Sequence, residues 1–157
     1  MADINDLAER FEKHLIETVG KRPTKIEMEK IDKQIRLSFD KIYDKPDKNP
    51  KIVKEVYDKE LSNIWGRIVA NEASFSEFEL FMKYSNVNRN SNLVSICSGL
   101  AVFELFIAKE IVSGGIISCI DISKEMSKKA KDYSRKLNIK NIDIIVNDVK
   151  NLPIKDN

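Results

Sequence analysis

The sequence predicts an α/β protein in which an α-helical region precedes a partial doubly wound parallel sheet of three strands. Through the first 85 residues, apolar side chains recur at spacings of three and four, which is typical of amphipathic helices. After residue 92, short apolar runs of strand length alternate with helical stretches. Such an alternation forms a parallel sheet through right-handed crossovers, which we expect to place helices on both of its faces. The change of pattern predicts two regions, 1–88 and 89–157.

Four amphipathic helices are expected in the first region. Asp3 can cap the first helix, whose apolar stripe leaves the sole histidine, His14, near the charged face, so we expect His14 at the surface. Thr24 and Glu27 have the pattern of a capping box that begins the second helix. Ser74 begins the fourth helix with a similar box. The four helices are expected at about residues 3–20, 24–43, 51–73 and 74–84.

Three apolar strands and two helices are expected in the second region, after a loop rich in asparagine at residues 85–92. The strands contain few polar residues, which is typical of a parallel sheet covered by helices. The predicted strands are Leu93–Cys97, Ile116–Ile120 and Ile142–Val146, and the predicted helices are Ala101–Val112 and Ser123–Leu137.

Candidate binding residues follow each strand, because ligands of such sheets bind at the carboxyl ends of the strands. After the first strand, Ser98 and Gly99 are small enough for a ligand to approach the main chain. Asp121 ends the second strand and can accept two hydrogen bonds from a ribose diol. Asn147 and Asp148 follow the third strand, where a side chain can reach the exocyclic amine of a nucleobase.

Three segments in register resemble a known family. Segments 93–101, 115–126 and 146–157 are similar to the first three motifs of the class I, Rossmann-like S-adenosylmethionine-dependent methyltransferases, in the N-terminal half of their catalytic domain. The resemblance implies S-adenosyl-L-methionine as cofactor and methyl transfer to a small-molecule acceptor. It leaves the catalytic residues unknown. The cofactor-binding residues that it implies are Cys97, Ser98, Gly99, Ala101, Asp121, Ile122, Met126, Asn147, Asp148 and Val149.

The first motif departs from the family pattern at three positions. Ser95 stands where the family usually has an acid, and Cys97 and Ala101 stand where it usually has glycine. Ala101 fits without strain if its backbone φ is negative. Glu104, one helical turn further on, could partly substitute for the missing acid.

Each candidate residue also has a structural interpretation. Gly99 is a glycine of the kind that any strand-to-helix turn needs, and Asp121 is a possible helix cap beside the equally suitable Ser123. Asp148 could be a solvated loop acid, and Met126 fits a core position. A dinucleotide is the runner-up ligand, but its fingerprint needs three glycines.

Composition limits the partners of the protein. The 27 Lys and Arg residues nearly balance the 25 Asp and Glu residues, which excludes a strongly basic nucleic-acid binder. Cys97 and Cys119 lie in apolar runs without metal-ligand spacing, so neither a disulfide framework nor a metal site is expected. No apolar window is long enough for a membrane span, and no signal peptide is evident, so we expect a cytoplasmic protein.

The resemblance also implies that part of the family's sheet is missing. Its strands four to seven have no counterpart in the 157 residues, so we expect a truncated fragment that is inactive alone. The first strand would then be an open edge, through which the chain could self-associate. Residues 1–88 resemble the helical cap or lid of such enzymes, although helix packing explains Tyr57 and Trp65 better than a role over the cofactor does. The alternative function is a non-catalytic, degenerate module that binds a partner protein.

Overall fold

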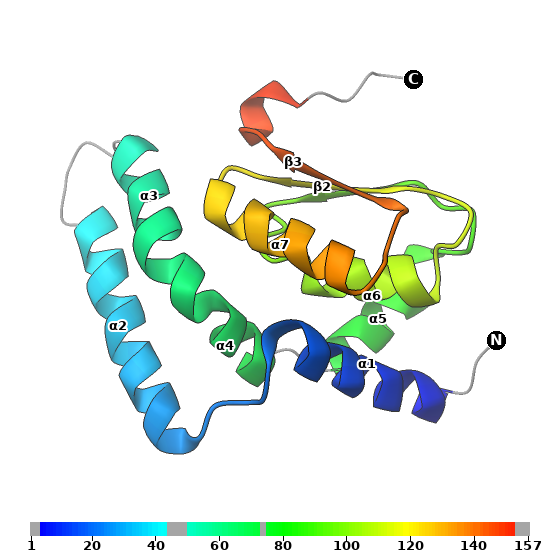
Figure 1. Ribbon diagram of the computed structural model, residues 1–157, viewed down its shortest axis with the longest axis horizontal. Coiled ribbons are helices and arrows are strands. Elements are labelled where there is room, and N and C mark those ends of the chain that lie inside the picture. The colour runs from blue at the N-terminus through cyan, green and yellow to red at the C-terminus, as the bar shows by residue number, and fades with distance from the viewer. Residues whose placement is uncertain (1–3, 44–49, 73–74, 153–157) are drawn as a thin grey trace. The chain divides into compact units, whose positions relative to one another are not determined.

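The structure, a computed structural model, describes residues 4–43, 50–72 and 75–152. The chain divides into two compact units, Met1–Asn86 and Val87–Asn157. The first unit is helical and the second contains a parallel sheet, so the predicted fold class is confirmed (Figure 1).

All regular secondary structure in the described part of the first unit is helical. The Thr24 capping box is confirmed, because the Thr24 N–H donates to Glu27 Oε2 over 2.9 Å and Thr24 Oγ1 accepts from the Glu27 N–H. The third predicted helix contains one π-helical turn, and the predicted caps Asp3 and Ser74 lie outside the described residues. The helical elements are α1 (Ile4–Val19), α2 (Lys25–Tyr43), α3 (Pro50–Val56), η1 (Tyr57–Leu61), α4 (Ser62–Glu72) and α5 (Phe75–Ser85).

The core of the first unit contains two buried phenylalanines and the histidine, with the half-buried Phe75 packed against both rings. Phe11, Phe75 and Phe78 pack with ring centroids 5.5–6.0 Å apart. The expectation of a surface His14 is wrong, because its side chain is only 1% exposed. His14 follows Phe11 by three positions, and this spacing places both on the buried face of α1.

The second unit is built on three parallel strands in the order β1-β2-β3. Its register pairs Ser95 with Cys119 and Asp121 with Val146. Among the described residues β1 pairs with β2 alone and forms one edge of the sheet. The elements are β1 (Leu93–Ile96), α6 (Val102–Glu110), β2 (Ile117–Asp121), α7 (Lys124–Lys136), β3 (Ile142–Val146) and the 3₁₀ turn η2 (Val149–Asn151).

Both helices of the second unit lie on the same side of the sheet, so the expectation of helices on both faces is wrong for the described part (Figure 1). Successive right-handed crossovers that step in one direction, β1 to β2 to β3, place their helices on a single face. Leu105 and Phe106 of α6 and Cys119 of β2 are fully buried. The other face includes Val94 and Ile96, which are 48% and 46% exposed.

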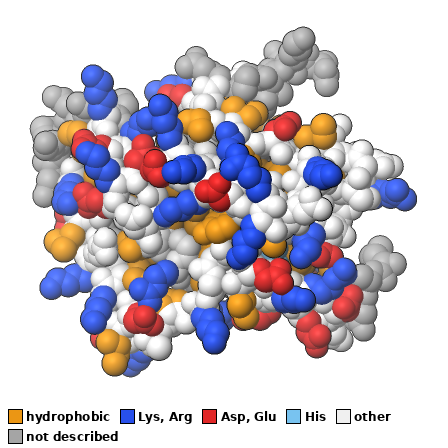
Figure 2. Space-filling model, viewed as in Figure 1, with side chains coloured by type: hydrophobic (Ala, Val, Ile, Leu, Met, Phe, Trp, Pro, Cys, Tyr) orange, Lys and Arg blue, Asp and Glu red, His pale blue; other side chains and the backbone are white. Residues whose placement is uncertain are grey.

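The surface carries charges of both signs. Figure 2 shows Lys and Arg side chains interspersed with Asp and Glu over the viewed face. Many of these charges form exposed ion pairs within one helix, such as Arg135 with Asp132 at 2.9 Å. Across residues 4–43, 50–72 and 75–152, no helix is both long and apolar enough to cross a bilayer.

Candidate functional site

The loop that joins β1 to α6 adopts a left-handed backbone at alternate residues. The φ angles are +59° at Cys97, +54° at Gly99 and +53° at Ala101. Only glycine adopts this region without steric cost, so Cys97 and Ala101 are strained. Ala101 would fit without strain only with a negative φ, and its φ is positive. These three positions are the ones at which the glycine-rich motif has glycine, and their conformation gives the physical reason for that pattern.

Asp121 connects the ends of β1 and β2 to the start of α7. Its Oδ2 accepts from the Gly99 N–H and its Oδ1 from the Ser123 N–H, both at 2.8 Å. Each carboxylate oxygen retains a second acceptor site for a ligand hydroxyl. The helix cap is Ser123, whose Oγ accepts from the Met126 N–H at 3.2 Å, so Asp121 serves the loop and not the helix.

The turn after β3 is stabilised by its own side chains. Asn147 Oδ1 accepts from the Asp148 N–H at 2.9 Å, and Asp148 Oδ1 accepts from the Lys150 N–H at 3.0 Å. The Asn147 N–H donates to the main-chain oxygen of Asp121 over 3.0 Å, which fixes this turn beside the end of β2. Asp148 is therefore a local turn acid that still has a second carboxylate oxygen for a ligand.

These loops enclose a small pocket at the carboxyl ends of the strands. Its volume is about 110 Å³, below the roughly 300–1,000 Å³ of a typical ligand site, so the described residues could enclose only part of a ligand. Apolar walls and a few polar groups are typical of nucleoside sites. The pocket is lined by Ile96, Cys97, Ile120, Asp121, Ile122, Asn147, Asp148 and Val149.

Six of the ten predicted binding residues meet in this pocket and four do not line it. Ser98, Gly99 and Ala101 form the adjoining loop, and Met126 is a core residue that is 2% exposed. The prediction did not include the wall residues Ile96 and Ile120. Each lies near the carboxyl end of its strand, and this position could have indicated them.

A carboxylate lies on the helix-covered side of the sheet, close to the loop. Ser95 Oγ on β1 donates to Glu104 Oε1 on α6 at 2.5 Å. Burial raises the pKa of Glu104 above its ordinary value, while the Ser95 hydrogen bond acts in the opposite direction. The pKa of the Cys119 thiol is raised, mainly by burial and secondly by the Glu104 charge.

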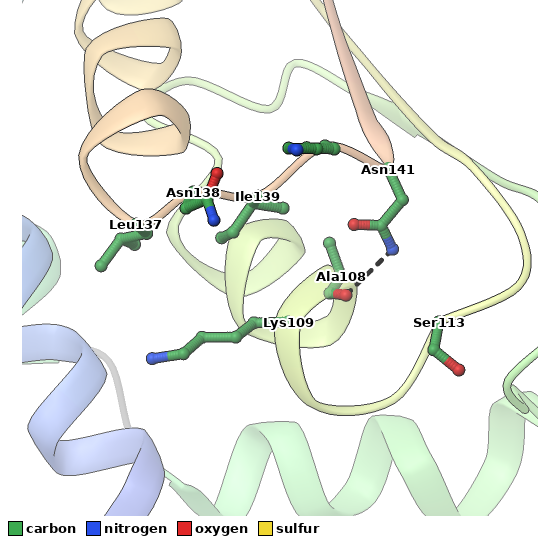
Figure 3. Close-up of a pocket in the computed structure, with 8 residues that line it drawn as sticks. Ala108, Lys109, Ser113, Leu137, Asn138, Ile139 and Asn141 are labelled. Carbon is green, nitrogen blue, oxygen red and sulfur yellow. Dashed lines mark hydrogen bonds between the residues drawn. The ribbon is translucent and has the colours of Figure 1, made fainter.

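A larger hollow of about 460 Å³ lies at the opposite edge, near the amino ends of the strands (Figure 3). There the Asn141 side-chain amide donates to the main-chain oxygens of Ala108, at 2.9 Å, and Val112. These hydrogen bonds satisfy main-chain oxygens at the end of α6, so the Asn141 side chain has a structural role there. We favour the smaller pocket as the site, because ligands of parallel sheets bind at the carboxyl ends of the strands. No cluster of potential metal ligands is present in the described segments.

Comparison with known proteins places this geometry in context. The sequence pattern of the ubiE/COQ5 methyltransferase family matches residues 40–157. Demethylmenaquinone methyltransferases from Listeria welshimeri and Listeria monocytogenes are 28% identical over 76 residues, which is 48% of this chain. The match spans only 32% of the length of these curated relatives.

Solved structures share the fold at low identity. Coclaurine N-methyltransferase, bound to N-methylheliamine and SAH, is 13% identical with a TM-score of 0.56, and the match covers 98% of this chain and 49% of that one. The [4+2]-cyclase SpnF is 17% identical with a TM-score of 0.58, over 68% of this chain and 46% of its own. At these identities the likeness concerns the fold alone.

Proposed function

The chain belongs to the ubiE/COQ5 methyltransferase family, and from this premise we propose that its second unit binds the adenosyl part of S-adenosyl-L-methionine in the pocket at the carboxyl ends of the strands. The observation that carries the proposal is the convergence of Asp121, Asn147 and Asp148 on one pocket with apolar walls. A methyltransferase of this family acts, in our proposal, on a small-molecule acceptor.

The residues present fit an adenosyl group. The Asp121 carboxylate is held in place by two backbone N–H groups and can still accept from both hydroxyls of a ribose. Ile96 and Ile120 line the pocket as apolar walls for a base, and we propose that Asp148, which lines it too, accepts from the amine of that base. Cys97 lines the same pocket with its backbone in the left-handed region.

Bound cofactor supplies a sulfonium methyl group that a nucleophile can displace in line. The residues of this unit bind and orient, because such a displacement depends mainly on the position of donor and acceptor. We assign no general base, because one is needed only where the acceptor must lose a proton. We propose that residues 1–88 act as a cap or lid, that the protein works in the cytoplasm, and that the edge of β1 is available for self-association.

The curated relatives suggest the class of acceptor. They are demethylmenaquinone methyltransferases, and a quinone-type ring is the acceptor that we propose to test first. The alternative is a non-catalytic module that binds a partner protein. The strained, non-glycine positions Cys97 and Ala101 and the absence of an acid at Ser95 favour this alternative.

Calorimetric titration with S-adenosylhomocysteine tests the binding proposal. Wild-type protein is expected to bind, and Asp121→Asn is expected to weaken binding about tenfold or more, because one charged acceptor is lost. Asp132→Asn is the matched control, since Asp132 is an exposed acid of α7 paired with Arg135. A folded wild-type protein that takes up no ligand at millimolar concentration would refute the proposal and favour the partner-binding alternative.

A further inference from the structure

Glu104 is a carboxylate that the pocket does not use. It lies in the first turn of α6, directly after the loop 97–101, and its carboxylate accepts a hydrogen bond from the Ser95 hydroxyl at 2.5 Å. Its side chain is half-buried on the helix-covered side of the sheet. Within the described residues it forms no ion pair with a Lys or Arg side chain.

This environment is costly for an anion. Burial disfavours the charged form, and the hydrogen bonds from the Ser95 hydroxyl and from the backbone N–H of Glu104 itself compensate only part of the lost hydration. The Glu104 charge acts on the Cys119 thiol, whose pKa is raised by burial and by the charges of Glu104 and Asp143, so that the thiol stays protonated. The α6 N-terminus favours a negative charge, but exposed acids obtain the same benefit without the desolvation.

The position of Glu104 relates it to the pocket. Its partner Ser95 immediately precedes Ile96, and Ile96 and Cys97 line the pocket. Glu104 also lies three residues after Ala101, the last strained residue of the loop. A negative charge at this place is adjacent to both ends of the loop that would contact a ligand.

We propose that Glu104 is a positioning residue for a cationic ligand: through Ser95 and the loop 97–101 it holds a negative charge behind the carboxyl end of β1, which favours a ligand that carries an ammonium or sulfonium group. The inference rests on the proposed function, because S-adenosylmethionine and its homocysteine product both carry an ammonium group. Helix α6 thus supplies the carboxylate of Glu104, which is hydrogen-bonded to Ser95 on β1. Ser95 itself carries no charge at that position of the strand.

The experiment moves the charge between the two positions. Glu104→Gln keeps a hydrogen-bond partner for Ser95 and removes the charge. The double change Ser95→Asp with Glu104→Gln returns one carboxylate to the same place from the strand side. Glu110→Gln is the control, because Glu110 ends the same helix, has a side chain that is 9% exposed, and faces Lys109 Nζ at 4.0 Å.

Binding of S-adenosylhomocysteine and urea unfolding are measured for all four proteins between pH 5 and 8. Glu104→Gln is expected to bind about tenfold more weakly at pH 7, the size of one charged interaction, and the double variant to recover most of that loss. Wild-type affinity should fall as pH decreases through the raised pKa of Glu104, relative to Glu104→Gln measured at the same pH. Because the raised pKa makes the folded protein less stable once Glu104 ionises, Glu104→Gln should be as stable as the wild type or more stable at pH 7.

Each alternative outcome overturns the inference. If Glu104→Gln binds as the wild type does, the positioning role is refuted while the proposed function stands. If Glu104→Gln is less stable and the double variant does not recover binding, Glu104 is a structural residue only. If the wild type itself does not bind, both the inference and the proposed function fail.

Discussion

Cys97 stores backbone strain that glycine would release. Its φ of +59° lies in the left-handed region, which costs a residue with a Cβ about 1–2 kcal/mol. Glycine removes that cost but adds about 0.5–1 kcal/mol of unfolded-state entropy. The Cys97 side chain is exposed, so little burial is lost. Cys97→Gly should therefore raise the free energy of unfolding by about 0.5–1 kcal/mol.

Ala101 and Ser98 provide the comparison within the same loop. Ala101 has a φ of +53° but is only 1% exposed, so Ala101→Gly also loses about 0.8 kcal/mol of methyl burial and should be nearly neutral. Ser98 is not among the residues with positive φ, and Ser98→Gly should destabilise by about 0.5–1 kcal/mol. Urea unfolding followed by circular dichroism measures all three. A Cys97→Gly protein no more stable than Ser98→Gly would refute the strain argument.

Three further predictions concern other parts of the chain. Gly115→Ala should destabilise by about 3 kcal/mol in the same urea assay, because a Cβ there would lie 2.0 Å from the Ser91 main-chain oxygen; an unchanged midpoint would contradict this packing. The Thr24 backbone N–H lowers the pKa of Glu27 from 4.5 to about 2. The free energy of unfolding of the wild type should therefore fall as pH decreases from 4.5 to about 2, because protonation removes the capping bond. A Glu27 signal that titrates near 4.5 in NMR would disprove this bond. A thiol reagent should label only Cys97 of the two cysteines in the native protein and both in urea, because Cys119 is buried and its thiol has a raised pKa. Rapid labelling of both cysteines before unfolding would contradict the burial of Cys119.

The family indicates one type of reaction, methyl transfer, whereas the fold occurs in proteins with different reactions. The same fold carries an N-methyltransferase and a [4+2]-cyclase among the solved structures, so the sheet alone does not fix a reaction. The binding experiment with the Asp121 variant tests whether the cofactor binds, and the Glu104 exchange tests whether Glu104 supplies the negative charge that Ser95 lacks. Together they separate a cofactor-binding unit from a degenerate module.

Local patterns in the sequence determined most of the secondary structure. Hydrophobic periodicity and capping motifs depend on neighbours within a few residues. The apolar pattern therefore located β3 at Ile142–Val146, and the spacing of Thr24 and Glu27 located the capping box, without tertiary information. The order of strands and their terminal polar residues also indicated Asp121, because the carboxyl ends of parallel strands meet at one edge.

Tertiary structure decided which side chains meet and which backbone positions are strained. The apolar pattern of α1 did not predict that His14 is buried. The buried face of the helix runs through Phe11 and His14, while Ile4 at the start of the helix is 49% exposed. The hydrogen bond between Ser95 and Glu104 joins a strand to the following helix, and the left-handed φ at Cys97 and Ala101 arises where that connection closes. Such features depend on how the helix packs against the sheet, which no local periodicity encodes.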